Sequence, residues 1–252
     1  MAKPLFSVKN LVKVFPNGNR GISGIDLDLY AGECVIIAGS NGSGKTLLAG
    51  MLLGLMEPTG GEIRFQGCSL DDAGAALRHG AGLVFQDTDA QIIGETVAED
   101  VGFGPKNLGF PKEEIRRRVK AALTAVGLED KGDYPPRRLS GGEKRRLVVA
   151  GVLAMGCETM ILDEPFANLD WPGVVQVLRV IRDLKQAGKT LIILTHELEK
   201  VLAFADRLVI LNQGLIRDDG PPGEVLDRLK DNYGVRDPRF SYVRVEDCTW
   251  LD

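Results

Sequence analysis

A run of eight small, polar and basic residues carries the strongest chemical signal in the sequence. It fits the pattern GxxxxGK[ST] and consists of Gly39, Ser40, Asn41, Gly42, Ser43, Gly44, Lys45 and Thr46. Glycines allow the backbone to curl so that successive N–H groups point at phosphate oxygens, and a following helix adds its positive end. Lys45 can reach the β- and γ-phosphates, and the Thr46 hydroxyl can bind Mg²⁺. The run predicts a phosphate-binding loop for a nucleoside triphosphate.

Two adjacent carboxylates end an apolar stretch further along the chain. Asp163 and Glu164 directly follow the residues TMIL at 159–162. We expect Asp163 to hold Mg²⁺ through its water shell, whereas Glu164 points differently and can polarise an attacking water. Downstream of a phosphate-binding loop, this pair predicts hydrolysis of the bound nucleotide.

A third segment combines a hydroxyl with bare glycine backbone between these two motifs. Ser140, Gly141 and Gly142 precede the run EKRRLVVAGVLAM, which has the composition of a helix. Ser140 is expected to cap that helix. Because the glycines carry no Cβ, their N–H groups are accessible, and the segment can form a second anion site.

The elements that must position these residues alternate between strands and helices. Strands are expected at 7–15, 25–30, 34–38, 62–67, 81–86, 159–163, 190–196 and 207–214, with helices at 46–56 and 172–187 and further helices between about 90 and 153. The alternation at 25–30 favours a half-buried antiparallel strand, and the apolar run at 34–38 favours a strand covered on both faces. Together they predict an α/β fold with a parallel, layered core.

Composition limits the partners and the compartment. The chain has 252 residues, and its 31 basic and 35 acidic residues give a net charge of −4, so no global attraction to nucleic acid is expected. Four scattered cysteines give no zinc-type spacing. No apolar run approaches the ~20 residues that span a bilayer. We expect the chain to stay in the cytoplasm and to contact a membrane only through a partner.

Taken in order, these motifs resemble the ATPase subunits of ABC transporters over residues from about 5 to 225. The resemblance implies a P-loop NTPase core with a mixed sheet, an N-terminal antiparallel β subdomain and an inserted helical subdomain at about 90–153. It implies an ABC ATPase domain at 1–230, and it leaves the tail at 231–252 without a role. The implied cofactors are ATP and Mg²⁺, bound between two ATPase subunits that are identical or close paralogues.

The resemblance also assigns roles to residues outside the three motifs. Gln86 matches the Q-loop glutamine, which binds Mg²⁺ and senses the γ-phosphate, and His196 matches the switch histidine that helps Glu164 in catalysis. Phe15 occupies the place of the aromatic residue that stacks on adenine. Ser140, Gly141 and Gly142 match the signature segment, which covers the nucleotide of the other subunit. Glu143 replaces the usual glutamine after this segment, and its anion is expected to weaken nucleotide binding slightly.

A narrower resemblance surrounds Gln86. Residues 84–92 and 96–110 are similar to the ATPases of energy-coupling-factor and cobalt or nickel importers, which implies uptake of a metal ion or vitamin. A transmembrane subunit is expected to dock near the Q-loop. The acidic residues expected to receive its basic coupling helix are Asp87, Asp89, Glu95, Glu99 and Asp100. The alternative is a soluble ABC ATPase acting on nucleic acid or the ribosome, and only the basic runs at 116–120 and 144–147 favour it. A kinase or GTPase is disfavoured because it would lack the signature segment.

Overall fold

The computed structural model describes residues 3–239. An antiparallel sheet of four strands, in the order β2-β1-β4-β5, forms the N-terminal part. Its strands are β1 (Phe6–Val14), β2 (Arg20–Leu29), β4 (Gly60–Phe65) and β5 (Cys68–Ser69). The alternating residues Ile25, Leu27 and Leu29 are buried, as strict alternation predicts for a strand with one covered face. The expected antiparallel β subdomain is confirmed.

A mixed sheet of six strands carries the predicted motifs. Its order is β10-β9-β3-β8-β7-β6, and all neighbours are parallel except β9 and β10. The strands are β3 (Cys34–Ala38), β6 (Ala81–Val84), β7 (Thr159–Asp163), β8 (Thr190–Thr195), β9 (Arg207–Asn212) and β10 (Leu215–Gly220). Every residue of β3, β7 and β8 is buried, which explains their continuous apolar runs. The carboxyl ends of these parallel strands meet at one edge of the sheet.

The two faces of this sheet pack into two separate cores. Ile36 of β3 belongs to a core that includes residues of α5, α6 and α7, whereas its neighbour Ile37 packs with α1 and the antiparallel sheet. The helices and short 3₁₀ turns outside residues 90–155 are α1 (Lys45–Leu52), α2 (Leu70–Gly80), α6 (Trp171–Gln186), α7 (Leu198–Val201), η3 (Leu202–Phe204), α8 (Pro222–Asp227) and η4 (Asp231–Tyr233). The sheet thus forms the middle layer of an α/β sandwich.

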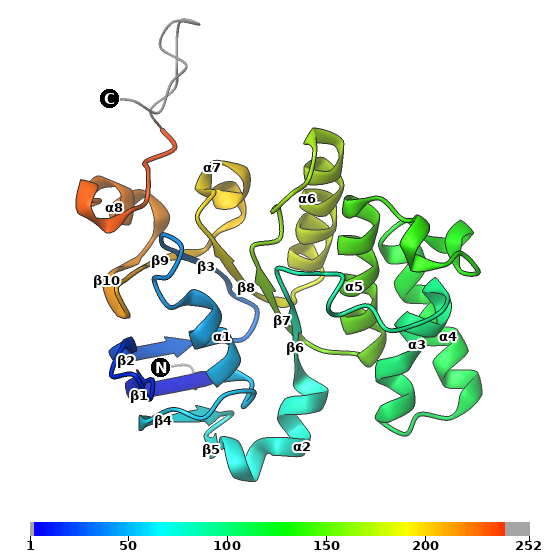
Figure 1. Ribbon diagram of the computed structural model, residues 1–252, viewed down its shortest axis with the longest axis horizontal. Coiled ribbons are helices and arrows are strands. Elements are labelled where there is room, and N and C mark those ends of the chain that lie inside the picture. The colour runs from blue at the N-terminus through cyan, green and yellow to red at the C-terminus, as the bar shows by residue number, and fades with distance from the viewer. Residues whose placement is uncertain (1–2, 240–252) are drawn as a thin grey trace, which may run out of the picture.

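Three helices form a separate group beside β6 (Figure 1). They are α3 (Val97–Asn107), α4 (Lys112–Ala125) and α5 (Gly141–Met155), with the turns η1 (Glu129–Lys131) and η2 (Pro136–Arg138) between α4 and α5. Thr96 and Glu99 cap the start of α3 reciprocally, and Pro111 directly precedes α4. This group matches the expected helical insertion, whose limits at 90 and 153 stay a prediction.

Several elements differ from those expected. Helix α1 ends at Leu52 rather than at 56, because the next residues form a turn in which Gly54 has a φ of 67°. Strand β6 ends at Val84, so Gln86 lies beyond it. Helix α2 and strand β10 were not expected, since α2 carries only two buried residues and none of β10 is fully buried, which leaves no clear apolar period. The residues of the predicted tail from 240 onward lie outside the described part.

Within residues 3–239, no helix is both long enough and apolar enough to cross a bilayer.

Candidate active site

The phosphate-binding loop connects the buried strand β3 to helix α1. A Cβ on Gly39 would lie 2.1 Å from the Leu211 carbonyl oxygen, so this position has room only for glycine. Gly44 precedes α1 with a φ of 108°, a conformation that favours glycine. The Lys45 side chain is buried, and its Nζ donates to the carbonyl oxygens of Gly39 at 2.7 Å and Ser40 at 3.2 Å. The loop thus holds the Lys45 ammonium group against its own carbonyl oxygens, where the phosphate is predicted to bind.

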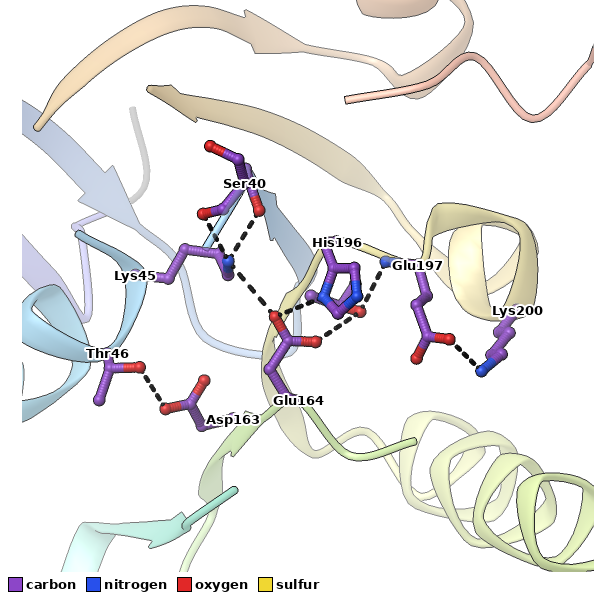
Figure 2. Close-up of polar contacts among 10 residues, drawn as sticks. Ser40, Lys45, Thr46, Asp163, Glu164, His196, Glu197 and Lys200 are labelled. Atoms are coloured by element: carbon purple, nitrogen blue, oxygen red, sulfur yellow. Dashed lines mark hydrogen bonds and ion pairs between the residues drawn. The ribbon is translucent and has the colours of Figure 1, made fainter. Parts of the chain in front are cut away.

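Two of the residues predicted to bind Mg²⁺, Thr46 and Asp163, contact each other. The Thr46 Oγ1 donates to Asp163 Oδ2 at 2.6 Å (Figure 2). Asp163 is 2% exposed, and its other oxygen, Oδ1, is buried without a hydrogen-bond partner among the described residues. Burial raises the pKa of this carboxyl, against the lowering effects of the Thr46 hydrogen bond and of Lys45 and Arg145. A buried carboxylate oxygen without a partner beside a hydroxyl is a donor set that fits Mg²⁺.

Glu164 lies at the centre of a buried polar cluster. Its Oε1 lies 3.3 Å from Lys45 Nζ and 3.0 Å from His196 Nδ1, and its Oε2 accepts from Thr195 Oγ1 at 3.2 Å (Figure 2). The backbone N–H of Glu164 donates to the Leu194 carbonyl at 2.8 Å, which ties the end of β7 to β8. Glu164 has a φ of 45°, and such left-handed backbone at a non-glycine residue often marks a functional site.

This arrangement can bind and hydrolyse a triphosphate. Backbone N–H groups of the loop and Lys45 supply positive charge for phosphate oxygens, and a triphosphate would take the place of the two carbonyl partners of Lys45. Glu164 is fixed by three neighbours, and a carboxylate so held can accept a proton from water. His196 touches the same carboxylate while its side chain is 41% exposed, so it can contact both Glu164 and a ligand.

The signature segment lies at the start of α5, where Ser140 caps the helix as expected. Ser140 Oγ accepts from the Glu143 N–H at 3.3 Å, and Glu143 Oε2 accepts from the Ser140 N–H at 2.9 Å. Although burial opposes it, the hydrogen bonds from Lys131 and from Ser140 lower the pKa of Glu143. The Glu143 charge is therefore engaged within its own chain, which argues against the expected repulsion of a nucleotide.

Gly141 is exposed and available to a ligand from outside the chain. A Cβ there would meet only Leu169 Cδ2, at the ordinary distance of 3.6 Å, and the Asn168 carbonyl oxygen at 3.8 Å, so the fold does not require a glycine. In contrast, a Cβ on Gly142 would lie 3.1 Å from the Gly173 Cα. Among the described residues, no hydrogen bond joins the signature segment to the phosphate-binding loop.

Gln86 and Phe15 lie outside the buried cluster. Gln86 is exposed, and its carbonyl accepts from Arg145 Nη2 at 2.9 Å. Phe15 is half-buried in the turn after β1, near the backbone of Gly21. Their roles stay predictions. The sequence analysis missed two residues, Thr195 and Arg145, that contact predicted site residues. The signal for Thr195 was its position directly before His196. The signal for Arg145 was its position five residues after Ser140.

Comparisons with known proteins agree with this geometry. A family model described as ABC transporter matches residues 22–167. The energy-coupling factor transporter ATP-binding protein EcfA of Methanocaldococcus jannaschii is 40% identical over 244 residues, covering 95% of this chain and 88% of that protein. The structure of cbiO1 from Clostridium perfringens, described as part of the ABC transporter complex cbiONQ, has a TM-score of 0.82, 35% identity, and coverage of 90% of this chain and 92% of its own.

A second structural neighbour shows a dimer. It is described as the dimeric post-hydrolysis state of an ATP-binding cassette bound to ADP and Pi, and it has a TM-score of 0.77, 26% identity, and coverage of 86% of this chain and 98% of its own. The family model covers more than half of the chain, and the relatives cover nearly all of it. The chain therefore belongs to the ABC transporter family, as an ATPase that resembles the ATP-binding subunits of energy-coupling factor transporters.

Proposed function

We propose that the chain hydrolyses MgATP as the ATPase subunit of an importer of energy-coupling-factor type, peripheral to the membrane, and powers uptake of a metal ion or vitamin through a transmembrane partner. The convergence of Lys45, Asp163, Glu164 and His196 around one loop is the observation that carries this proposal. Thr46 and Asp163 would hold Mg²⁺, with Gln86 reaching it from the Q-loop. Bound Mg²⁺ would neutralise charge on the β- and γ-phosphate oxygens. Glu164 acts as the base and His196 steadies the water or the phosphate.

The proposal includes a second ATPase subunit, identical or closely paralogous. Phosphate bound by the loop of one subunit would be covered by Ser140, Gly141 and Gly142 of the other. The exposed, unobstructed Gly141 supports this, because its own chain makes no use of the missing Cβ. Phe15 would stack on the adenine.

A groove between α3 and α4 supports docking of the membrane partner near the Q-loop. The groove has a volume of about 1110 Å³, and its apolar lining includes Ile93, Phe103, Phe110 and Ile115. Ile93 is 58% and Phe103 47% exposed, and exposed apolar side chains of this size mark interaction sites. We assign this groove to an apolar face of a coupling helix.

The acidic residues expected to attract that helix mostly have partners within the chain. Asp89 pairs with Lys144 at 2.6 Å, and Asp100 accepts from the N–H groups of Ile93 and Gly94. Asp87 accepts two backbone N–H groups, and Glu99 caps α3. Of the five, only Glu95 and Glu99 line the groove. Apolar contact therefore supports docking better than charge does.

Phe103→Glu is expected to weaken association with the transmembrane subunit at least about tenfold, because truncating or charging a central aromatic anchor costs 2 kcal/mol or more. ATP binding should be unchanged. The measurement is the amount of transmembrane subunit that co-purifies with the tagged chain after co-expression. Leu55→Glu is the matched control, since Leu55 is 63% exposed and lies outside the groove. Equal loss in both variants would contradict the assignment of the groove.

The basic runs give no support to a nucleic-acid function. Arg116, Arg117 and Arg118 pair with Glu113 or Glu114 on the same helix. In the second run Lys144 pairs with Asp89, and both arginines are buried. Co-purification with a membrane protein rather than with nucleic acid tests the choice, and transport of labelled metal ions or vitamins in vesicles that contain both subunits would identify the substrate.

A further inference from the structure

Two neighbouring arginines of α5 make the same kind of contact with different partners. Arg145 and Arg146 are 3% and 9% exposed, and the Nε of each is buried without a hydrogen-bond partner among the described residues. Arg145 donates to the carbonyl oxygens of Phe85 at 2.6 Å and Gln86 at 2.9 Å. Arg146 donates to two consecutive carbonyls as well, those of Val126 and Gly127 after α4.

The contact of Arg145 fixes a segment that otherwise has few ties to the sheet. Strand β6 ends at Val84, and the chain then leaves the ladder. The Gln91 side chain bonds to the backbone on both sides of this strand end. It accepts from the Phe85 N–H at 3.0 Å and donates to the Leu83 carbonyl at 2.9 Å. The Arg145 guanidinium adds the bonds to the Phe85 and Gln86 carbonyls, and a planar fork bonded to two consecutive carbonyls fixes both their position and their orientation.

We propose that Arg145 is a positioning residue that couples the signature helix to Gln86. Arg145 lies three residues after Gly142, so a shift of the start of α5 when the signature segment meets a nucleotide moves the Gln86 backbone with it. A buried fork with two bonds transmits such a shift because protein interiors are close-packed. The inference rests on the proposed function, in which Gln86 reaches Mg²⁺ and the γ-phosphate.

Arg146 shows what a purely structural role would look like. It has similar burial, the same helix and the same donation to paired carbonyls, but its partners join α4 to α5 within the helical group. Substituting either arginine should therefore cost comparable thermal stability, since each change leaves two carbonyls without their donor. Only the substitution of Arg145 should change how the site responds to Mg²⁺.

The test compares Arg145→Gln with Arg146→Gln in the purified full chain. For Arg145→Gln we expect turnover at saturating ATP to fall about tenfold and the half-saturating Mg²⁺ concentration to rise severalfold, since misplacement by about 1 Å can cost up to 10²-fold. Binding of a fluorescent ATP analogue in EDTA should stay unchanged. Arg146→Gln should keep the wild-type Mg²⁺ dependence and turnover within about twofold. Arg145→Lys should show much of the same loss as Arg145→Gln, because lysine keeps the charge but lacks the planar fork that bonds to both carbonyls.

Equal Mg²⁺ dependence in Arg145→Gln and Arg146→Gln, with hydrolysis by the wild-type chain intact, would overturn the coupling role alone. Absence of Mg²⁺-dependent hydrolysis in the wild-type chain would instead overturn the proposed function. Should Arg145→Gln fail to fold, the same comparison between Arg145→Lys and Arg146→Lys decides, because lysine keeps the charge and loses the fork. A changed Mg²⁺ dependence confined to Arg145→Lys would support the coupling.

Discussion

Glu164→Gln is expected to bind ATP at least as tightly as the wild-type chain and to hydrolyse it at least about a hundredfold more slowly, because positioned general-base assistance contributes 10²–10⁴ in rate. The amide keeps the volume of the side chain. It can also keep the hydrogen bond from Thr195 to Oε2. What it loses is the negative charge beside the triphosphate and the ability to take a proton from water.

A phosphate-release assay, with binding of a fluorescent ATP analogue measured in parallel, checks this expectation. Glu197→Gln is the matched control, because Glu197 lies next to His196 but pairs with Lys200. Its turnover should stay close to that of the wild-type chain. Near-normal turnover in Glu164→Gln would mean that Glu164 is not the base.

Lys45→Ala is expected to abolish measurable turnover and to weaken ATP binding by about tenfold to a hundredfold, since hydrogen bonds to charged groups contribute roughly 1.5–3 kcal/mol. Lys45 is the cation of the phosphate-binding loop, and it lies 3.3 Å from Glu164 Oε1. Its loss removes positive charge both from the predicted phosphate site and from the proposed base.

Titration with a fluorescent ATP analogue separates the binding loss from the catalytic loss. Lys189→Ala serves as the control, because Lys189 pairs with Glu158 just before β8 begins, at the opposite edge of the sheet from the site. Unchanged turnover in Lys45→Ala would contradict the assignment of the loop.

The parts of the site that lie in continuous sequence could be predicted. The loop at 39–46, the pair at 163–164 and the cap at Ser140 depend on local rules of turns, strand ends and helix starts, and the structure places each at the expected end of its element. The mixed sheet and the antiparallel β subdomain were implied by the resemblance to ABC transporter ATPases, and both are present. Strands β3 and β7 have the predicted bounds, because strands covered on both faces are continuously apolar.

Contacts across the fold could not be predicted. The bonds from Arg145 to the Q-loop carbonyls and from Thr195 to Glu164 join residues far apart in sequence, and neither residue type reveals its partner. The pairing of Asp89 with Lys144 of α5 likewise joins residues far apart in sequence. The groove forms where α3 packs against α4, and no local pattern reveals that packing. The acidic residues were therefore the stronger signal in the sequence.

The central claim is that ATP is bound between two subunits, each covering the nucleotide of the other. Size-exclusion chromatography of Glu164→Gln with MgATP tests it most directly, with the double variant Glu164→Gln, Gly141→Asp as comparison. Gly141 is exposed, and a Cβ there makes only ordinary contacts, so the added carboxylate should leave the fold and ATP binding intact while repelling the partner's triphosphate. We predict a dimer for the single variant and a monomer for the double variant. Dimers in both, or an ATP-bound monomer in both, would contradict the account.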